Sequence, residues 1–174
     1  SEPERVFAVH KGYADAGAEF ITANTFGANS LKYDNVDELV KAGVALAKKA
    51  GKYVALDIGP TGKLLKPMGD LEFERAVELF AEVVRAGKDG SDVAIIETMS
   101  DMYELKAAVI AVKENSDLPI ITSMIFDESG RLLTGGDVKS AVAMLEGLRV
   151  DAIGFNCGLG PKQMIPLVKE LREC

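Results

Sequence analysis

Histidine and cysteine, which often carry acid–base and thiol chemistry, are scarce in this sequence. The 174 residues include one histidine, two cysteines and no tryptophan. His10 falls on a helix expected to lie away from the strand ends, so we predict that it packs in the protein and forms no catalytic triad. Cys157 and Cys174 make no disulfide framework, which favours a reducing cytoplasm.

Long apolar runs are also absent. No stretch approaches the roughly 20 apolar residues of a membrane span, and no signal-peptide pattern opens the chain. The net charge of −7 and the isoelectric point of about 4.8 argue against nucleic acid or an anionic membrane as a partner. With 48% hydrophobic residues, we expect one globular cytoplasmic domain comprising residues 1–174.

Short apolar segments alternate with amphipathic ones along the whole chain. Strands are predicted at residues 19–26, 53–58, 93–98, 119–126 and 150–155. Helices are predicted at residues 1–18, with Ser1 as the cap, at 36–50 and at 161–173. Three more are predicted to begin at Asp70, which would be the N-cap, directly after residue 98, and at Asp137. This alternation indicates an α/β fold with a parallel sheet. The pattern alone favours an open doubly wound sheet, because a complete (β/α)₈ barrel takes eight strands and typically ~250 residues.

Polar residues follow the predicted strands and should gather at one edge of the sheet. Glu97 ends the apolar run from Val93 to Ile96. A carboxylate there needs a protein donor or a cationic substrate group. It either stabilises a helix terminus or binds substrate. Asp57 precedes Gly-Pro, and we interpret it as bracing a turn.

Cys157 lies where the last strand meets the last helix, a position at which parallel α/β folds keep their chemistry. It is either a small buried hydrophobe or a thiolate that binds metal or attacks substrate. We interpret Asn24 and Asn156 as structural. The run Gly158-Leu159-Gly160 at the helix start is a weak phosphate-binding signal.

Five motifs occur in an order that resembles a known family. They are Thr22-Ala-Asn-Thr-Phe-Gly-Ala28, Asp57-Ile-Gly-Pro-Thr-Gly62, Glu97-Thr-Met-Ser-Asp101, Leu133-Thr-Gly-Gly-Asp137 and Gly154-Phe-Asn-Cys-Gly-Leu-Gly-Pro161. Together with His10 and Tyr13, they resemble the homocysteine S-methyltransferase family, including the homocysteine-binding modules of its cobalamin-dependent members. The resemblance covers essentially the whole chain.

The resemblance implies a (β/α)₈ barrel of which this chain holds the middle, without the first strand and the last two strand–helix units. It implies zinc held by three cysteines, of which Cys157 matches the first, and a substrate amino group bound by Glu97. The adjacent cysteine pair of the family has no match here. The expected activity is methyl transfer to the homocysteine thiol, with methylcobalamin on another module, betaine or S-methylmethionine as donor. We therefore expect this chain to be inactive alone, with zinc absent or weakly bound.

Two other functions compete with this one. The first is a small-molecule or phosphate-binding open α/β protein without metal, using Gly158 to Gly160. The second is a non-enzymatic fragment that folds or self-associates through exposed sheet edges.

Overall fold

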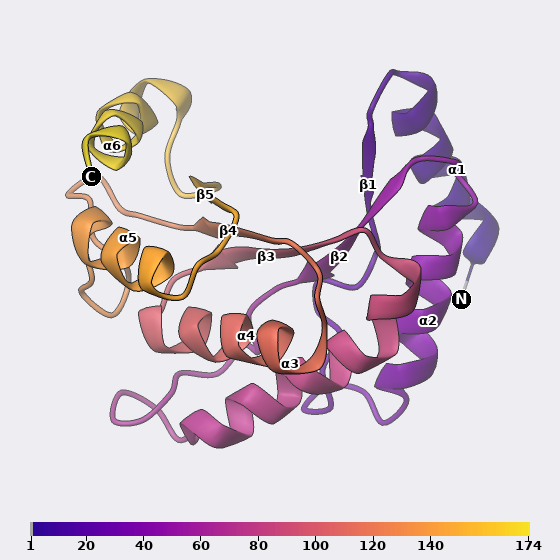
Figure 1. The fold of residues 1–174 in the computed structure, drawn as a ribbon, viewed down its shortest axis with the longest axis horizontal. Coiled ribbons are helices and arrows are strands. Elements are labelled where there is room, and N and C mark those ends of the chain that lie inside the picture. Colours follow the sequence, from indigo (N-terminus) through magenta and orange to yellow (C-terminus); the bar gives the residue numbers. More distant parts are fainter. Residues whose placement is uncertain (1) are drawn as a thin grey trace.

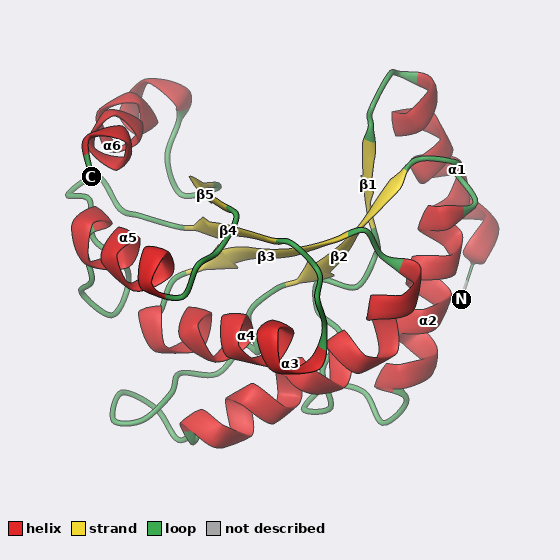
Figure 2. Ribbon diagram, viewed as in Figure 1, coloured by secondary structure: helices red, strands yellow, loops and turns green. Residues whose placement is uncertain are grey.

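A curved sheet of five parallel strands forms the centre of the protein (Figures 1 and 2). The computed structural model describes residues 2–174, so the predicted role of Ser1 as a helix cap lies outside the described residues. The strands follow one another in sequence order across the sheet. They are β1 (Phe20–Thr22), β2 (Tyr53–Ile58), β3 (Val93–Met99), β4 (Ile120–Met124) and β5 (Ala152–Phe155).

Six α-helices and one short 3₁₀ helix alternate with these strands. They are α1 (Pro3–Asp15), α2 (Val36–Lys48), α3 (Phe73–Gly87), η1 (Lys88–Gly90), α4 (Met102–Asn115), α5 (Val138–Gly147) and α6 (Pro161–Glu173). Helices α2 to α5 cover the convex face of the sheet, and α1 and α6 stand at its two ends (Figure 1). A doubly wound sheet would carry helices on both faces. The curvature and the one-sided cover are therefore those of an incomplete barrel, and the open sheet favoured by the pattern alone is wrong.

Alternation along the strands separates a helix-facing set of side chains from a concave-facing set. Leu56, Ile58, Ala94 and Ile96 are at most 2% exposed. Leu56 reaches α3, where a methyl group on Gly87 would come within 2.4 Å of it. Because neighbouring side chains in a strand point to opposite faces, Asp57 and Glu97 face the concave side. The fold thus places both carboxyl groups where no helix of the described chain covers the sheet.

Several predicted boundaries need correction. Strands β4 and β5 are shorter than the predicted ranges 119–126 and 150–155, and α2 ends at Lys48 and not at residue 50. The strand expected at residues 19–26 is limited to Phe20–Thr22, since the chain turns at Ala23 to Thr25 to begin its path toward α2. The first helix ends at Asp15 and not at residue 18. Asp70 is not an N-cap: α3 begins at Phe73 after Glu72, whose side chain makes no capping bond. Asp70 instead pairs with Lys63 across the preceding loop.

Other predicted helix starts are confirmed. Asp137 caps α5 by accepting hydrogen bonds from the Ser140 backbone N–H and hydroxyl. Pro161 occupies the first turn of α6, where its missing N–H costs little.

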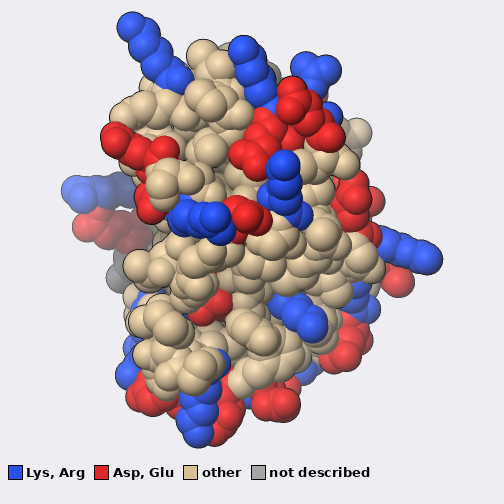
Figure 3. Space-filling view, turned by 90° about the vertical axis from the view of Figure 1, so that its left-hand side faces the viewer, with Lys and Arg blue, Asp and Glu red and all other residues tan. Residues whose placement is uncertain are grey.

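The outer surface carries charges of both signs. Lysine, arginine, aspartate and glutamate side chains are interspersed over the side of the molecule that carries α5 and α6 (Figure 3). None of the helices in residues 2–174 is long and apolar enough to cross a membrane.

Candidate functional site

The carboxyl ends of β3, β4 and β5 bring four polar side chains together. Register pairs Ile95 with Ile121, and Ile121 with Ala152, so these residues form one row across the sheet. Further along, Ser123 pairs with Gly154, and the register between β3 and β4 shifts between Ile96 and Met99, so Glu97 and Thr98 both lie opposite Ser123. Asn156 and Cys157 follow directly after β5. The edge predicted from the sequence is therefore present, and it contains Glu97 and Cys157.

Asn156 links the three strands. Its Oδ1 accepts hydrogen bonds from the Ser123 hydroxyl at 2.5 Å and from the Thr98 backbone N–H at 3.1 Å. Its Nδ2 donates to Thr98 Oγ1 at 2.8 Å and lies 3.4 Å from both Glu97 Oε2 and Cys157 Sγ. The amide thus connects the carboxylate of β3 to the thiol after β5. The structural role predicted for Asn156 is confirmed, but no sequence signal indicated that Asn156 joins the two candidate site residues.

Two non-glycine residues of this cluster adopt left-handed backbone conformations. Thr98 has φ of 65° and Cys157 has φ of 54°. Such conformations are disfavoured for residues with a Cβ, and β-branched threonine is a clear outlier. Such strained conformations persist where contacts with the surrounding structure hold the backbone in place. They are common at functional sites. Thr98 lies within the register shift between β3 and β4 and makes two hydrogen bonds with Asn156.

Asp57 on β2 pairs with Glu97 on β3. Asp57 lies level with Ile95, so Glu97 is its diagonal neighbour on the concave face. Asp57 is 7% exposed. Burial, together with the negative charge of Glu97 and a hydrogen bond between the two carboxyl groups, raises the pKa of Asp57 to about 8. The Asp57 side chain accepts no hydrogen bond from the following turn within the described residues, so its interpretation as a turn brace is wrong.

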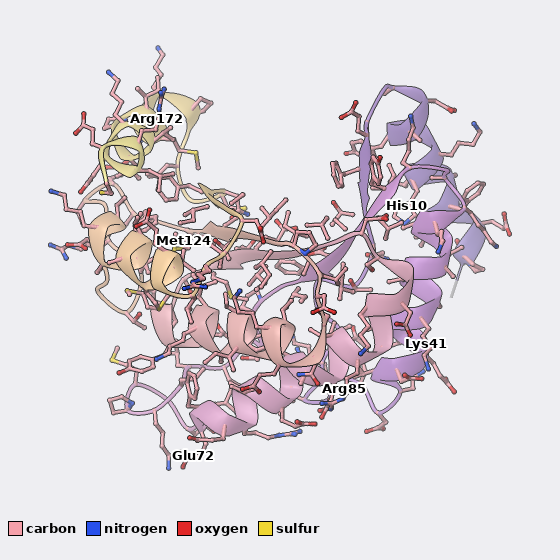
Figure 4. The ribbon with its side chains drawn as sticks, viewed as in Figure 1. His10, Lys41, Glu72, Arg85, Met124 and Arg172 are labelled. Atoms are coloured by element: carbon pink, nitrogen blue, oxygen red, sulfur yellow. The ribbon has the colours of Figure 1, made fainter. Side chains whose placement is uncertain are left out.

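His10 lies closer to this face than its helix position suggested. It is 6% exposed and, with Asp57 and Asn24, lines a cavity of about 530 Å³ between α1 and the β1 edge. Its label in Figure 4 lies on the sheet side of α1. Burial lowers the pKa of His10. Nε2 has no hydrogen-bond partner among the described residues. Packing of His10 is confirmed, but its nearness to Asp57 was not expected.

Cys157 is exposed, so its interpretation as a small buried hydrophobe is wrong. Its thiol is free to meet a ligand at the rim. Cys174 is also exposed, and its Sγ contacts the Glu170 carbonyl oxygen on the last helix. Across residues 2–174, no three histidine, cysteine, aspartate or glutamate side chains converge on a point suited to a metal. A catalytic zinc needs three protein ligands, so these residues by themselves do not fit zinc.

The loop Gly158-Leu159-Gly160 uses its N–H groups for hydrogen bonds within the chain. The N–H of Leu159 donates to the Cys157 carbonyl, and the N–H of Gly160 donates to Gln163 Oε1. Gly158 has φ of 66°, and a methyl group there would come within 3.0 Å of the Phe126 carbonyl oxygen. Glycine is thus required for close approach to the segment after β4. Two of the N–H groups that could hold a phosphate are already paired.

Sequence reasoning missed Glu104 on α4. This side chain is 3% exposed and accepts hydrogen bonds from the Thr61 N–H at 2.8 Å and the Thr61 hydroxyl at 2.6 Å. Desolvation raises the pKa of Glu104, and the bonds from Thr61 oppose that rise. Glu104 therefore fixes the loop that follows Asp57. The only available sequence signal was a charged residue among the apolar residues of a helix. Such a charged side chain more often faces solvent.

Comparison with known proteins agrees with this geometry. The family model for homocysteine S-methyltransferase matches residues 1–174. The chain belongs to the homocysteine S-methyltransferase family. The resemblance drawn from the five ordered motifs is thereby confirmed.

Relatives and solved structures extend the comparison. The chain is 28% identical to methionine synthase of Mycobacterium leprae over 194 residues and to that of Mycobacterium tuberculosis over 192 residues. These matches cover 99% and 98% of this chain, but the chain spans only 16% of the length of either relative.

The metallated form of the homocysteine methyltransferase MmuM from Escherichia coli superimposes with a TM-score of 0.86 at 22% identity, covering 99% of this chain and 69% of that one. Its apo form gives a TM-score of 0.79. The likeness confirms the barrel-type α/β fold and its incompleteness here.

Proposed function

We propose that this chain forms the homocysteine-binding part of an enzyme that transfers a methyl group to the homocysteine thiol, giving methionine. Family membership supports the reaction type. We place the substrate on the concave face because hydrogen-bonding contacts link Glu97 through Asn156 to Cys157 there. This link brings a carboxylate, suited to the ammonium end of an aminothiol, and a thiol, suited to its sulfur end through a metal, to one rim of the sheet.

Glu97 is the proposed anchor for the substrate ammonium group. It is half-buried at the end of β3, and within the described residues no salt bridge involves it. Its hydrogen-bonding contacts to Asn156 and Thr98 are long, both at 3.4 Å, so its oxygens keep capacity to accept. A hydrogen bond to a charged group contributes about 1.5–3 kcal/mol.

Cys157 is the proposed first cysteine of a zinc site. Zinc held by Cys157 together with ligands from outside these residues would favour loss of the substrate thiol proton and so would supply a thiolate nucleophile. The described residues supply one thiol and no converging partners, so we expect no tight zinc site and no turnover from these residues alone. The methyl donor is proposed to come from another module or from a small molecule, with methylcobalamin as the methionine synthase-like choice.

The test of Glu97 is calorimetric titration with L-homocysteine. Glu97→Gln keeps the shape and removes the charge, and we expect the binding free energy to weaken by about 1.5–3 kcal/mol. Glu114→Gln is the matched control, because Glu114 is exposed on the outer side of α4. Equal affinity of the Glu97 variant and the control would remove the anchor role.

A further inference from the structure

Asp57 lies beside Glu97, the proposed substrate anchor, and has no part in the proposed function. Asp57 lies level with Ile95, so Glu97 is its diagonal neighbour on the same face, and hydrogen bonding between the two carboxyl groups is one of the causes that raise the pKa of Asp57. Two carboxyl groups can share a hydrogen bond only if one of them keeps its proton. The more deeply buried Asp57 is the one that keeps it, because burial disfavours the charged form. Without ligand, the pair therefore consists of a neutral Asp57 that donates to an ionised Glu97.

Asp57 retains one unused acceptor. Its Oδ1 is buried and has no hydrogen-bond partner within the described chain. An unpaired buried oxygen is costly, and such groups in native structures are usually explained by a ligand or an ordered water. Asp57 is also one of the residues that line the cavity between α1 and β1.

No cation of the described chain neutralises the pair. The titratable groups that line the cavity beside Asp57 are His10 and Tyr13 from α1, and neither is hydrogen bonded to it. From β3 comes Glu97, and Cys157 after β5 contacts Glu97 only through Asn156. The cavity lining includes no lysine or arginine. Lys41 and Arg85 project from α2 and α3 on the convex side (Figure 4).

We propose that Asp57 and Glu97 together bind the primary ammonium group of the substrate, and that Asp57 gives up its proton to solvent when the ammonium enters. This inference rests on the proposed function and adds a second substrate-binding residue to it. An ammonium group carries three donors and one positive charge. It can satisfy the free Asp57 Oδ1 and Glu97 while replacing the shared proton. One proton leaves the protein, and no bond of the substrate changes.

Proton release gives the pair a selectivity that a single carboxylate lacks. A ligand without a positive charge cannot offset the repulsion of two ionised carboxylates. The pair therefore favours amino acids over their desamino analogues. The raised pKa of Asp57, about 8, implies that the proton is present at neutral pH in the ligand-free protein. The affinity for a ligand with an ammonium group should then rise about tenfold for each unit by which the pH increases from 6 to 7.5.

The test is calorimetric titration with L-homoserine, which keeps the ammonium and carboxylate of homocysteine but has no thiol to release a proton. Titration in phosphate and in Tris at pH 6.5 gives the number of protons released. We expect close to one for the unmodified protein and for the control Asp117→Asn, an exposed position. We expect none for Asp57→Asn, with affinity at least tenfold weaker at pH 7.5 and independent of pH. 4-Mercaptobutanoate, the desamino analogue of homocysteine, should bind without release.

A second readout needs no variant. In infrared difference spectra, the C=O stretch of a neutral carboxylic acid should disappear when L-homoserine is added. Proton release and pH dependence that persist in Asp57→Asn would overturn the inference, as would an unchanged infrared band or no binding of L-homoserine at millimolar concentration. If Glu97→Gln still weakens homocysteine binding in that case, the proposed function stands without the second carboxylate. If Glu97→Gln has no effect on homocysteine, the proposed function itself fails.

Discussion

Replacing Asp57 by asparagine should make the protein more stable at neutral pH, although it alters a buried strand residue. Asparagine cannot ionise, and its amide N–H can still donate to Glu97. In the unmodified protein, burial and Glu97 raise the pKa of Asp57 from 3.8 to about 8. The stability that the neutral form contributes is fully present below about pH 4 and is lost as the pH rises toward 8.

The size of the effect follows from the pKa shift. Each unit is equivalent to about 1.36 kcal/mol. Ionisation over the roughly three units between pH 4 and pH 7 therefore sets an upper limit of about 4 kcal/mol. Water entry and local relaxation reduce such penalties. We expect the variant to gain about 1–3 kcal/mol over the unmodified protein between pH 5 and pH 8.

The assay is urea denaturation at half-unit pH steps from 4.5 to 8.5. Asp117→Asn, at an exposed loop position, controls for loss of one negative charge. The Asp57 variant should show a flatter pH profile than either the unmodified protein or the control. Parallel profiles for all three proteins would show that Asp57 is ionised throughout this pH range and that its pKa is not raised.

Three further outcomes are expected. Asn156→Ala should lower the free energy of unfolding by about 1–3 kcal/mol in urea denaturation, because it leaves the Thr98 N–H and the Ser123 hydroxyl without an acceptor; a change below about 0.5 kcal/mol would contradict this role. The isolated chain should self-associate in sedimentation velocity, because β1 and β5 each pair with one neighbour only; a monodisperse, cooperatively melting monomer would count against it. The chain should retain no stoichiometric zinc after dialysis and should not methylate homocysteine; zinc that disappears in Cys157→Ser, together with turnover, would show that these residues complete the site.

Local sequence signals predicted most of the fold. The limits of β2, the starts of α2 and α6, and the capping of α5 follow from periodicity and turn chemistry. The barrel did not follow from pattern, because an open and a closed parallel sheet share the same alternation of elements. Only the resemblance carried by the ordered motifs distinguished them.

The site was less accessible to sequence reasoning for a physical reason. Glu97 and Cys157 stood out because each ends a strand. The pairing of Asp57 with Glu97 depends on the register between β2 and β3, and no local pattern encodes that register. The same holds for the reach of Asn156 to Ser123 and Thr98 across the sheet. The exposure of Cys157 and its left-handed backbone after β5 likewise had no local sequence signal.

We propose that homocysteine binds on the concave face with its ammonium group at the neighbouring carboxyl groups of Asp57 and Glu97. A crystal structure of the protein with L-homocysteine tests it most directly. We expect the amino nitrogen to lie within hydrogen-bond distance, about 2.7–3.2 Å, of oxygens of both Glu97 and Asp57, with the sulfur directed toward Cys157. An amino nitrogen held elsewhere, with the Asp57–Glu97 hydrogen bond intact, would contradict it.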